Sequence, residues 1–199
     1  MMLTPDSSAG WYGKLPVLGD FAQRRLPPEF VEAWDAWLAK GLAEWQAQDD
    51  AWLDSYLSGP SWRFILTPGV LGASAWAGVL MPSCDRVGRY FPLGIAQAIA
   101  LPASDTAAQG LLDWLLRLDD LAVDAMQDDW PVDQFEAELG RVVAQASEHV
   151  GPMTESVLQL APGQTLWISQ GPQGEPVLRR YQGLQPVVAL FESSAAAEE

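Results

Sequence analysis

Apolar residues recur at helical spacing in two long segments of the chain. Between Pro28 and Trp45 they return every three or four residues, which places them on one face of a helix. Residues 104–126 repeat this pattern, with leucines on one side and aspartates available for solvent on the other. Shorter helices are predicted from Asp49 to Leu57 and from Asp133 to Gln145, and we expect His149 on the surface or at a helix end.

Short apolar runs bounded by glycine and proline predict strands on both sides of the acidic helical segment. The last of them form a hairpin around the turn at residues 171–174. Pro186 to Phe191 is apolar but of undetermined type. Gly10–Leu15 is predicted as a short strand or an extended arm. The other predicted strands are Trp62–Leu66, Ala75–Met81, Tyr90 or Phe91 to Ala98, Thr165–Ser169 and Val177–Tyr181.

The order of these elements predicts an α+β fold in a single layered domain over residues 1–191. Strands at both ends with helices between them indicate a mainly antiparallel central sheet flanked by helices, an α-β-α sandwich. The domain comprises a motif-rich part (10–95), an acidic helical part (104–148) and a C-terminal hairpin (165–181). Residues 192–199 carry no large apolar group after Glu192, so we expect a flexible tail whose removal leaves stability unchanged.

The composition narrows the possible partners. The 199 residues are 49% hydrophobic and carry a formal net charge of −15. This charge would repel nucleic acid and anionic membrane surfaces, which proteins bind through clustered cations. No apolar run approaches the ~20 residues of a membrane-spanning helix, and the N-terminus shows no secretory pattern. We therefore predict a cytoplasmic protein with no nucleic-acid partner and no membrane insertion.

Familiar catalytic and cofactor motifs are missing from the sequence. Cys84 is the only cysteine and His149 the only histidine, which excludes an intramolecular disulfide and zinc sites built from several such ligands. The glycine-rich phosphate-binding motifs and the serine-hydrolase motif are absent. The adjacent aspartate pairs diverge on helices and are typical of solvated faces. We expect no catalytic residues, no metal and no cofactor.

The most distinctive candidate site is the segment Asp85–Leu93, in which Arg86 and Arg89 flank Gly88 and precede an aromatic pair. Two arginines in an acidic chain suit recognition of a carboxylate or phosphate. Lys14 and Asp20, in the glycine-bracketed segment near the N-terminus, complete the set of candidate residues. A structural role is the alternative, in which Arg86 pairs with Asp85 or Asp20 and Gly88 serves a tight turn.

Several ordered motifs resemble the type VI secretion-associated TagF (ImpM) family. The match is dense through residues 10–95, whereas the later helices are only compatible with the family. The motifs are Gly10-Trp11-Tyr12-Gly13-Lys14-Leu15-Pro16, Gly19-Asp20-Phe21, Trp62-Arg63-Phe64, Pro68-Gly69-Val70, Trp76-Ala77-Gly78-Val79-Leu80-Met81-Pro82-Ser83 and Asp85-Arg86-Val87-Gly88-Arg89-Tyr90-Phe91-Pro92-Leu93.

This resemblance implies a cytoplasmic accessory protein of a type VI secretion system in a Gram-negative bacterium, without enzymatic activity of its own. Members of the family repress the apparatus post-translationally, and the forkhead-associated scaffold protein Fha is the implied partner. Some members are fused to a phosphatase domain, which these 199 residues do not have room for. The alternative is an unrecognised enzyme or phospho-ligand-binding protein that uses the loop of Asp85, Arg86 and Arg89.

Overall fold

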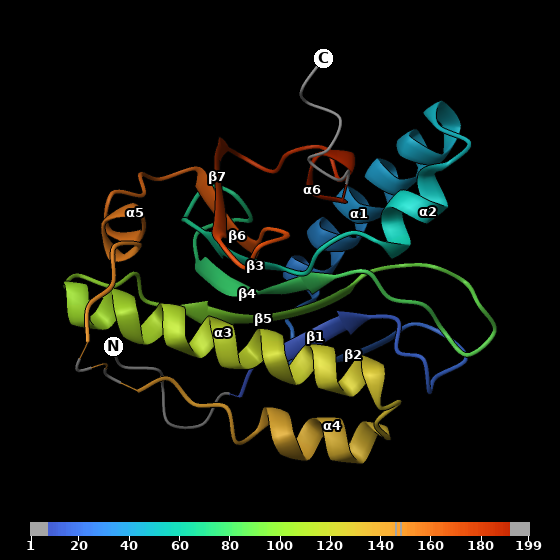
Figure 1. Cartoon of the computed structure of the whole chain (residues 1–199), viewed down its shortest axis with the longest axis horizontal. Helices are drawn as coiled ribbons and strands as arrows, with labels where there is room; N and C mark the ends of the chain where they lie inside the picture. Colours follow the sequence, from blue (N-terminus) through green and yellow to red (C-terminus); the bar gives the residue numbers. More distant parts are fainter. Residues whose placement is uncertain (1–7, 146, 148, 192–199) are drawn as a thin grey trace.

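A computed structural model describes residues 8–145, 147 and 149–191 of the chain. Their strands form one seven-stranded sheet in the order β2-β1-β5-β4-β3-β6-β7, and every neighbouring pair is antiparallel (Figure 1). The strands are β1 (Gly10–Gly13), β2 (Ala22–Arg24), β3 (Trp62–Leu66), β4 (Ala75–Met81), β5 (Leu93–Ile99), β6 (Gln164–Gln170) and β7 (Pro176–Gln182).

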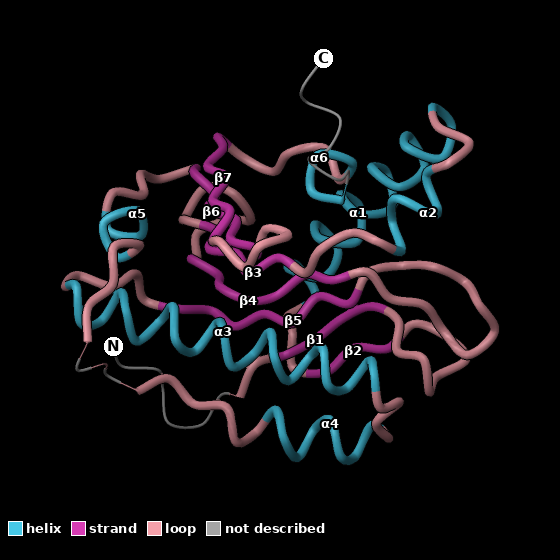
Figure 2. The backbone as a smooth tube through the Cα atoms, in the orientation of Figure 1, coloured by secondary structure: helices cyan, strands magenta, loops and turns pink. Residues whose placement is uncertain are grey.

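Helices cover both faces of this sheet, as Figure 2 shows. One apolar core lies between the sheet and α3, α4 and α5, and a second lies between the opposite face and α1, α2 and α6. The predicted α+β layered fold is therefore confirmed. The helices are α1 (Pro28–Gln48), α2 (Trp52–Leu57), α3 (Asp105–Gln127), α4 (Val132–Leu139), α5 (Thr154–Leu158) and α6 (Val188–Phe191).

The central strands are apolar on both faces because each face is covered. In β3, Ile65 contributes to the core under α3, whereas its neighbours Phe64 and Leu66 contribute to the core under α1. Every residue of β3 and β4 is buried. This explains why these strands read as continuous apolar runs rather than as alternating ones.

The helix predicted from Asp133 to Gln145 is shorter than expected. It ends at Leu139, and Gly140 follows as its C-cap. The chain then runs along α3, where the indole of Trp114 donates a hydrogen bond to the carbonyl of Val142 at 3.2 Å. The prediction was therefore wrong beyond residue 139. His149 lies exposed in a bend, which agrees with its expected place on the surface and not with one at a helix end.

Smaller differences occur at element ends. Neither the strand β2 nor the helix α5 was predicted. The apolar segment before residue 192 ends in the short helix α6. β5 begins only at Leu93, because Pro92 has no amide proton to donate.

The predicted tail at 192–199 lies outside the described residues, so the effect of its removal stays a prediction. No described helix is long and apolar enough to cross a membrane.

Candidate functional site

Two loops of the motif-rich part meet at one end of the sheet. One connects β4 to β5 and contains Asp85, and the other connects β1 to β2 and contains Lys14. They meet because β1 pairs with β5, which places the end of β1 beside the start of β5. At this contact Gly13 has a φ of +134°, and a Cβ there would lie 2.1 Å from the carbonyl oxygen of Pro92. Only glycine fits this close approach.

The carboxylate of Asp85 organises the β4–β5 loop. Its side chain is fully buried. Oδ2 accepts hydrogen bonds from Nζ of Lys14 and Nε of Arg89, each at 2.7 Å, and Oδ1 accepts from the amides of Val87 and Arg89 at 3.0 and 2.9 Å. The amide of Gly88 closes a turn onto the carbonyl of Asp85 at 3.0 Å. Both carboxylate oxygens therefore have hydrogen-bond partners, from the β4–β5 loop and from Lys14 of the β1–β2 loop.

These contacts decide the ionisation of the carboxyl group. Burial alone would raise the pKa of Asp85, but hydrogen bonds from Lys14, Arg89 and Val87 outweigh it and hold the pKa well below its usual range. A carboxylate that stays ionised, with both oxygens occupied, is poorly suited to act as a general acid or base near neutral pH. The geometry assigns Asp85 to loop architecture.

Hydrogen bonds and an ion pair connect this loop to the β1–β2 loop. The amide of Arg86 donates to the carbonyl of Leu18 at 2.8 Å. Nη2 of Arg89 donates to the carbonyl of Gly19 and lies 3.8 Å from Oδ1 of Asp20. The two loops therefore form one connected surface, with Arg89 as the side chain that joins them.

Below this surface, buried polar groups support Lys14. Its carbonyl accepts a hydrogen bond from the hydroxyl of Ser83 at 2.7 Å, and its ammonium lies 4.7 Å from the centre of the Phe21 ring. Ser83 in turn is held by Tyr56, which donates to the Ser83 carbonyl at 2.8 Å and accepts from the Ser83 amide at 2.9 Å. The sequence pattern gave no signal for Tyr56, because its helix lies far from this motif along the chain.

Arg86 differs from the other candidate residues. Its side chain is exposed and makes no ion pair or hydrogen bond with any residue in the described part of the chain. Val87, next to it, is 66% exposed, and Phe21 on the adjoining loop is 43% exposed. A free guanidinium beside exposed apolar side chains, all on a fixed backbone, is a composition typical of protein recognition surfaces.

The candidate residues thus separate into two groups. Lys14, Asp85 and Arg89 come together in one ion-pair network, with Asp20 at its rim. Arg86 stays outside, so the alternative in which it pairs with Asp85 or Asp20 is wrong, and Arg89 takes that position. The exposed Phe21 and Val87 were not singled out from the sequence, although large apolar residues in loops are a usable signal.

Cys84 supplies a thiol beside this site. Within residues 8–145, 147 and 149–191, no cluster of three or more histidine, cysteine or acidic side chains could hold a metal ion. Burial and the nearby carboxylates of Asp85 and Asp129 raise the pKa of the Cys84 thiol, which disfavours the reactive thiolate.

Comparison with known proteins identifies a family and a similar solved structure. Residues 10–142 match the model of the TagF N-terminal domain, described as type VI secretion system-associated. The structure is similar to the crystal structure of PA0076 from Pseudomonas aeruginosa PAO1, with a TM-score of 0.73 and 38% sequence identity over 92% of each chain. No curated protein matches the sequence. All five candidate residues lie within 10–142.

Proposed function

The chain belongs to the TagF family of type VI secretion-associated proteins, and from this premise we propose that it is a non-enzymatic, cytoplasmic repressor of the secretion apparatus. It acts after translation, by binding the forkhead-associated scaffold protein Fha. The observation that carries the proposal is the exposed Arg86 on a loop that Asp85 holds in place.

The rigidity of this loop favours binding. Its backbone is fixed by the hydrogen bonds of Asp85 and by the contact between Arg86 and Leu18, so little conformational entropy is lost when a partner docks. Arginine is also among the residues that contribute most to binding energy at interfaces. An acidic or phosphorylated surface on Fha would complement the guanidinium.

The arrangement of polar groups speaks for binding rather than catalysis. The carboxylate of Asp85 is hydrogen-bonded within the protein, and the guanidinium of Arg89 donates hydrogen bonds to Asp85 and to the carbonyl of Gly19. The remaining group, Arg86, has no base or nucleophile as a hydrogen-bonded neighbour in the described part of the chain. An enzyme built on these three residues would lack an available proton acceptor.

A charge reversal tests the proposal. Because Arg86 is exposed, Arg86→Glu should fold normally and weaken binding to purified Fha at least about tenfold, the size expected for an interface arginine. Binding is measured by titration calorimetry, and secretion is assayed in cells that carry the variant. The same variant should relieve repression.

Lys40→Glu is the matched control, because Lys40 is an exposed cation on α1 and the change in net charge is identical. This variant should bind Fha normally. Wild-type affinity in a folded Arg86→Glu variant would contradict the use of this loop, and absence of any Fha binding by the wild-type chain would contradict the partner.

A further inference from the structure

The free edge of β7 is a second candidate interaction surface, far along the chain from the loop of Asp85. Among the described residues, β7 is the last strand of the sheet and pairs only with β6. It follows residue 142, so the family match does not extend to it. An unpaired strand presents amide and carbonyl groups that another extended chain can bind.

Hydrogen bonds at the two ends of the hairpin establish which backbone groups of β7 face outward. The amide of Gly183 donates to the carbonyl of Gly163 at 2.8 Å, and the amide of Gly171 donates to the carbonyl of Glu175 at 2.7 Å. Hydrogen-bonded pairs alternate along an antiparallel ladder. With the observed register, the odd-numbered residues of β7 therefore bond to β6.

The even-numbered residues of β7 direct their backbone groups away from the sheet. They are also the exposed residues of the strand: Pro176, Leu178, Arg180 and Gln182. The register directs the amides of Leu178 and Arg180 away from β6, and outside the strand ladder no backbone hydrogen bond of the described residues uses them. This edge is therefore available over most of a seven-residue strand.

The opposite edge of the sheet offers no comparable site. It is formed by β2, which has only three residues. Short edge strands give an incoming chain few groups to pair with, and proteins use them to prevent unwanted strand addition. β7 has seven residues, so its length does not prevent strand addition.

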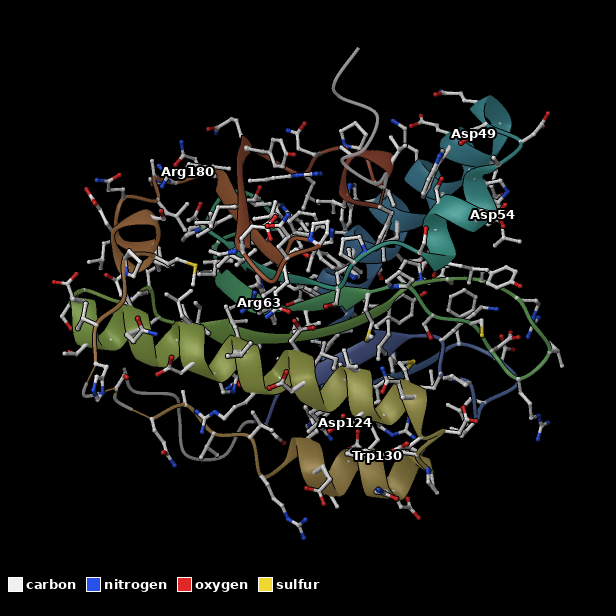
Figure 3. All side chains as sticks on the ribbon, viewed as in Figure 1. Asp49, Asp54, Arg63, Asp124, Trp130 and Arg180 are labelled. Carbon is white, nitrogen blue, oxygen red and sulfur yellow. The ribbon has the colours of Figure 1, made fainter. Side chains whose placement is uncertain are left out.

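The side chains of β7 indicate the chemistry of the incoming chain. Arg180 is exposed, and its Nη2 donates to the carbonyl of Ser156 at 2.9 Å, which holds the cation beside α5 at the sheet border (Figure 3). Arg179 turns to the other face, with its guanidinium 4.9 Å from the centre of the Trp62 ring. Leu178, between Pro176 and these arginines, is 37% exposed. The edge is therefore basic with one apolar contact.

We infer that the free edge of β7 binds an extended acidic segment of a partner protein by strand addition. Opposite charges on neighbouring strands stabilise a sheet, whereas like charges directly opposite destabilise it. Antiparallel self-pairing centred on Arg180 would place this cation directly opposite its own copy. Arg180 therefore disfavours that pairing and favours an acidic strand that alternates with apolar residues.

The probe for this inference is a phage-displayed library of random dodecapeptides, selected on the full chain and counter-selected on Leu178→Pro. Proline at this position removes one outward amide and no bond to β6, and proline is tolerated on edge strands in this orientation. Selected peptides should alternate acidic and apolar residues. They should bind Arg180→Glu, which was not used in the selection, at least about tenfold more weakly, while Lys40→Glu binds normally.

Amide hydrogen exchange provides a measurement that needs no variant. Saturating peptide should slow exchange at Leu178 and Arg180, and should change Arg179 and Tyr181 less, because those amides already bond to β6. Unchanged exchange at Leu178 and Arg180 with bound peptide would overturn the inference, as would selected peptides without acidic residues.

Other occupants of the edge give distinct results. A dimer of the full chain that dissociates in Leu178→Pro would replace the partner segment with a second copy. Protection of the Leu178 amide in the free chain that is lost after deletion of residues 192–199 would identify the chain's own C-terminus as the occupant. Neither result depends on Arg86, so failure of this inference is distinguishable from failure of the proposed Fha binding.

Discussion

The Asp85 side chain is fully buried, yet it accepts four hydrogen bonds from three residues and stays ionised. Its role follows from the cost of burying a charge, which is recovered only when cations and amides surround it. Lys14 and Arg89 supply the cations, one from each loop. A single residue therefore fixes the surface on which Arg86 is displayed.

Asp85→Asn should destabilise the protein, because it leaves the buried ammonium of Lys14 without its counter-ion. We expect a melting temperature lower by about 5 to 10 °C at neutral pH. Arg86→Ala is the matched control on the same loop and should melt within about 2 °C of the wild type, because its side chain is exposed. Equal melting temperatures for Asp85→Asn and the wild type would contradict the role of the carboxylate.

The same residue predicts a dependence on pH. Because the pKa of Asp85 is lower in the folded chain than in the unfolded chain, its contribution to stability is present above the unfolded pKa of about 4 and is lost as the pH falls through the folded pKa. Chemical denaturation between pH 7 and pH 2 should show a smaller acid-induced loss of stability in Asp85→Asn than in the wild type. Parallel curves for the two proteins would rule out this linkage.

At the scale of elements, an ion pair connects α3 to the sheet. Nε of Arg63 on β3 lies 3.6 Å from Oδ2 of Asp119 on α3, and both side chains are largely buried. Burial raises the pKa of Asp119, although Ser61 and Arg63 oppose the shift, and burial lowers the pKa of Arg63. Nε of Arg63 and Oδ1 of Asp119 have no hydrogen-bond partner in the described part of the chain. The pair is therefore held by charge rather than by hydrogen bonds.

Replacing one member of the Arg63–Asp119 pair should destabilise the protein more than replacing both. Arg63→Met leaves the Asp119 carboxylate buried without its cation and should lower the free energy of unfolding by about 3–5 kcal/mol. The double variant Arg63→Met with Asp119→Leu should recover most of this loss, because no uncompensated charge remains. Denaturant unfolding of both variants measures the difference. A double variant as unstable as Arg63→Met would argue that packing, rather than charge, explains the loss.

At the scale of the whole molecule, the sheet joins distant parts of the chain. β6 pairs with β3, so residues 164–170 lie beside residues 62–66. The core under α1 also contains Trp167, Leu190 and Phe191 from the C-terminal part. Neither half of the chain can bury its apolar surface without the other.

Limited proteolysis should therefore not yield two stable fragments separated near residue 100. Loss of the C-terminal part would expose the edge of β3 and the apolar face of α1, and the remaining fragment would be degraded. Mass spectrometry of early digestion products measures this, with cleavage expected first in the loops. Two long-lived fragments that meet near residue 100 would contradict the prediction of a single domain.

The sequence by itself determined the elements with strong local signals. Apolar periodicity defined α1 and α3, and continuous apolar runs bounded by proline and glycine defined β3 and β4, because these patterns reflect burial on one or both sides. The sequence motifs also indicated the family, and they identified Lys14 and the segment Asp85–Leu93 as candidate site residues. The sequence did not predict where the helix that begins near residue 132 ends. The contact of Trp114 with Val142, which redirects the chain there, joins residues far apart in the sequence.

Only the tertiary structure decided which of two arginines three residues apart is free. In the sequence Arg86 and Arg89 have the same chemistry and belong to the same short segment. The fold turns Arg89 toward Asp85 and Gly19 and turns Arg86 outward, because the amides of Val87 and Arg89 wrap around one carboxylate. Strand order likewise depended on non-local pairing, and it left the edge of β7 unpaired within the described chain. Local patterns report which residues are buried, but partners brought together from distant segments determine which groups remain available for binding.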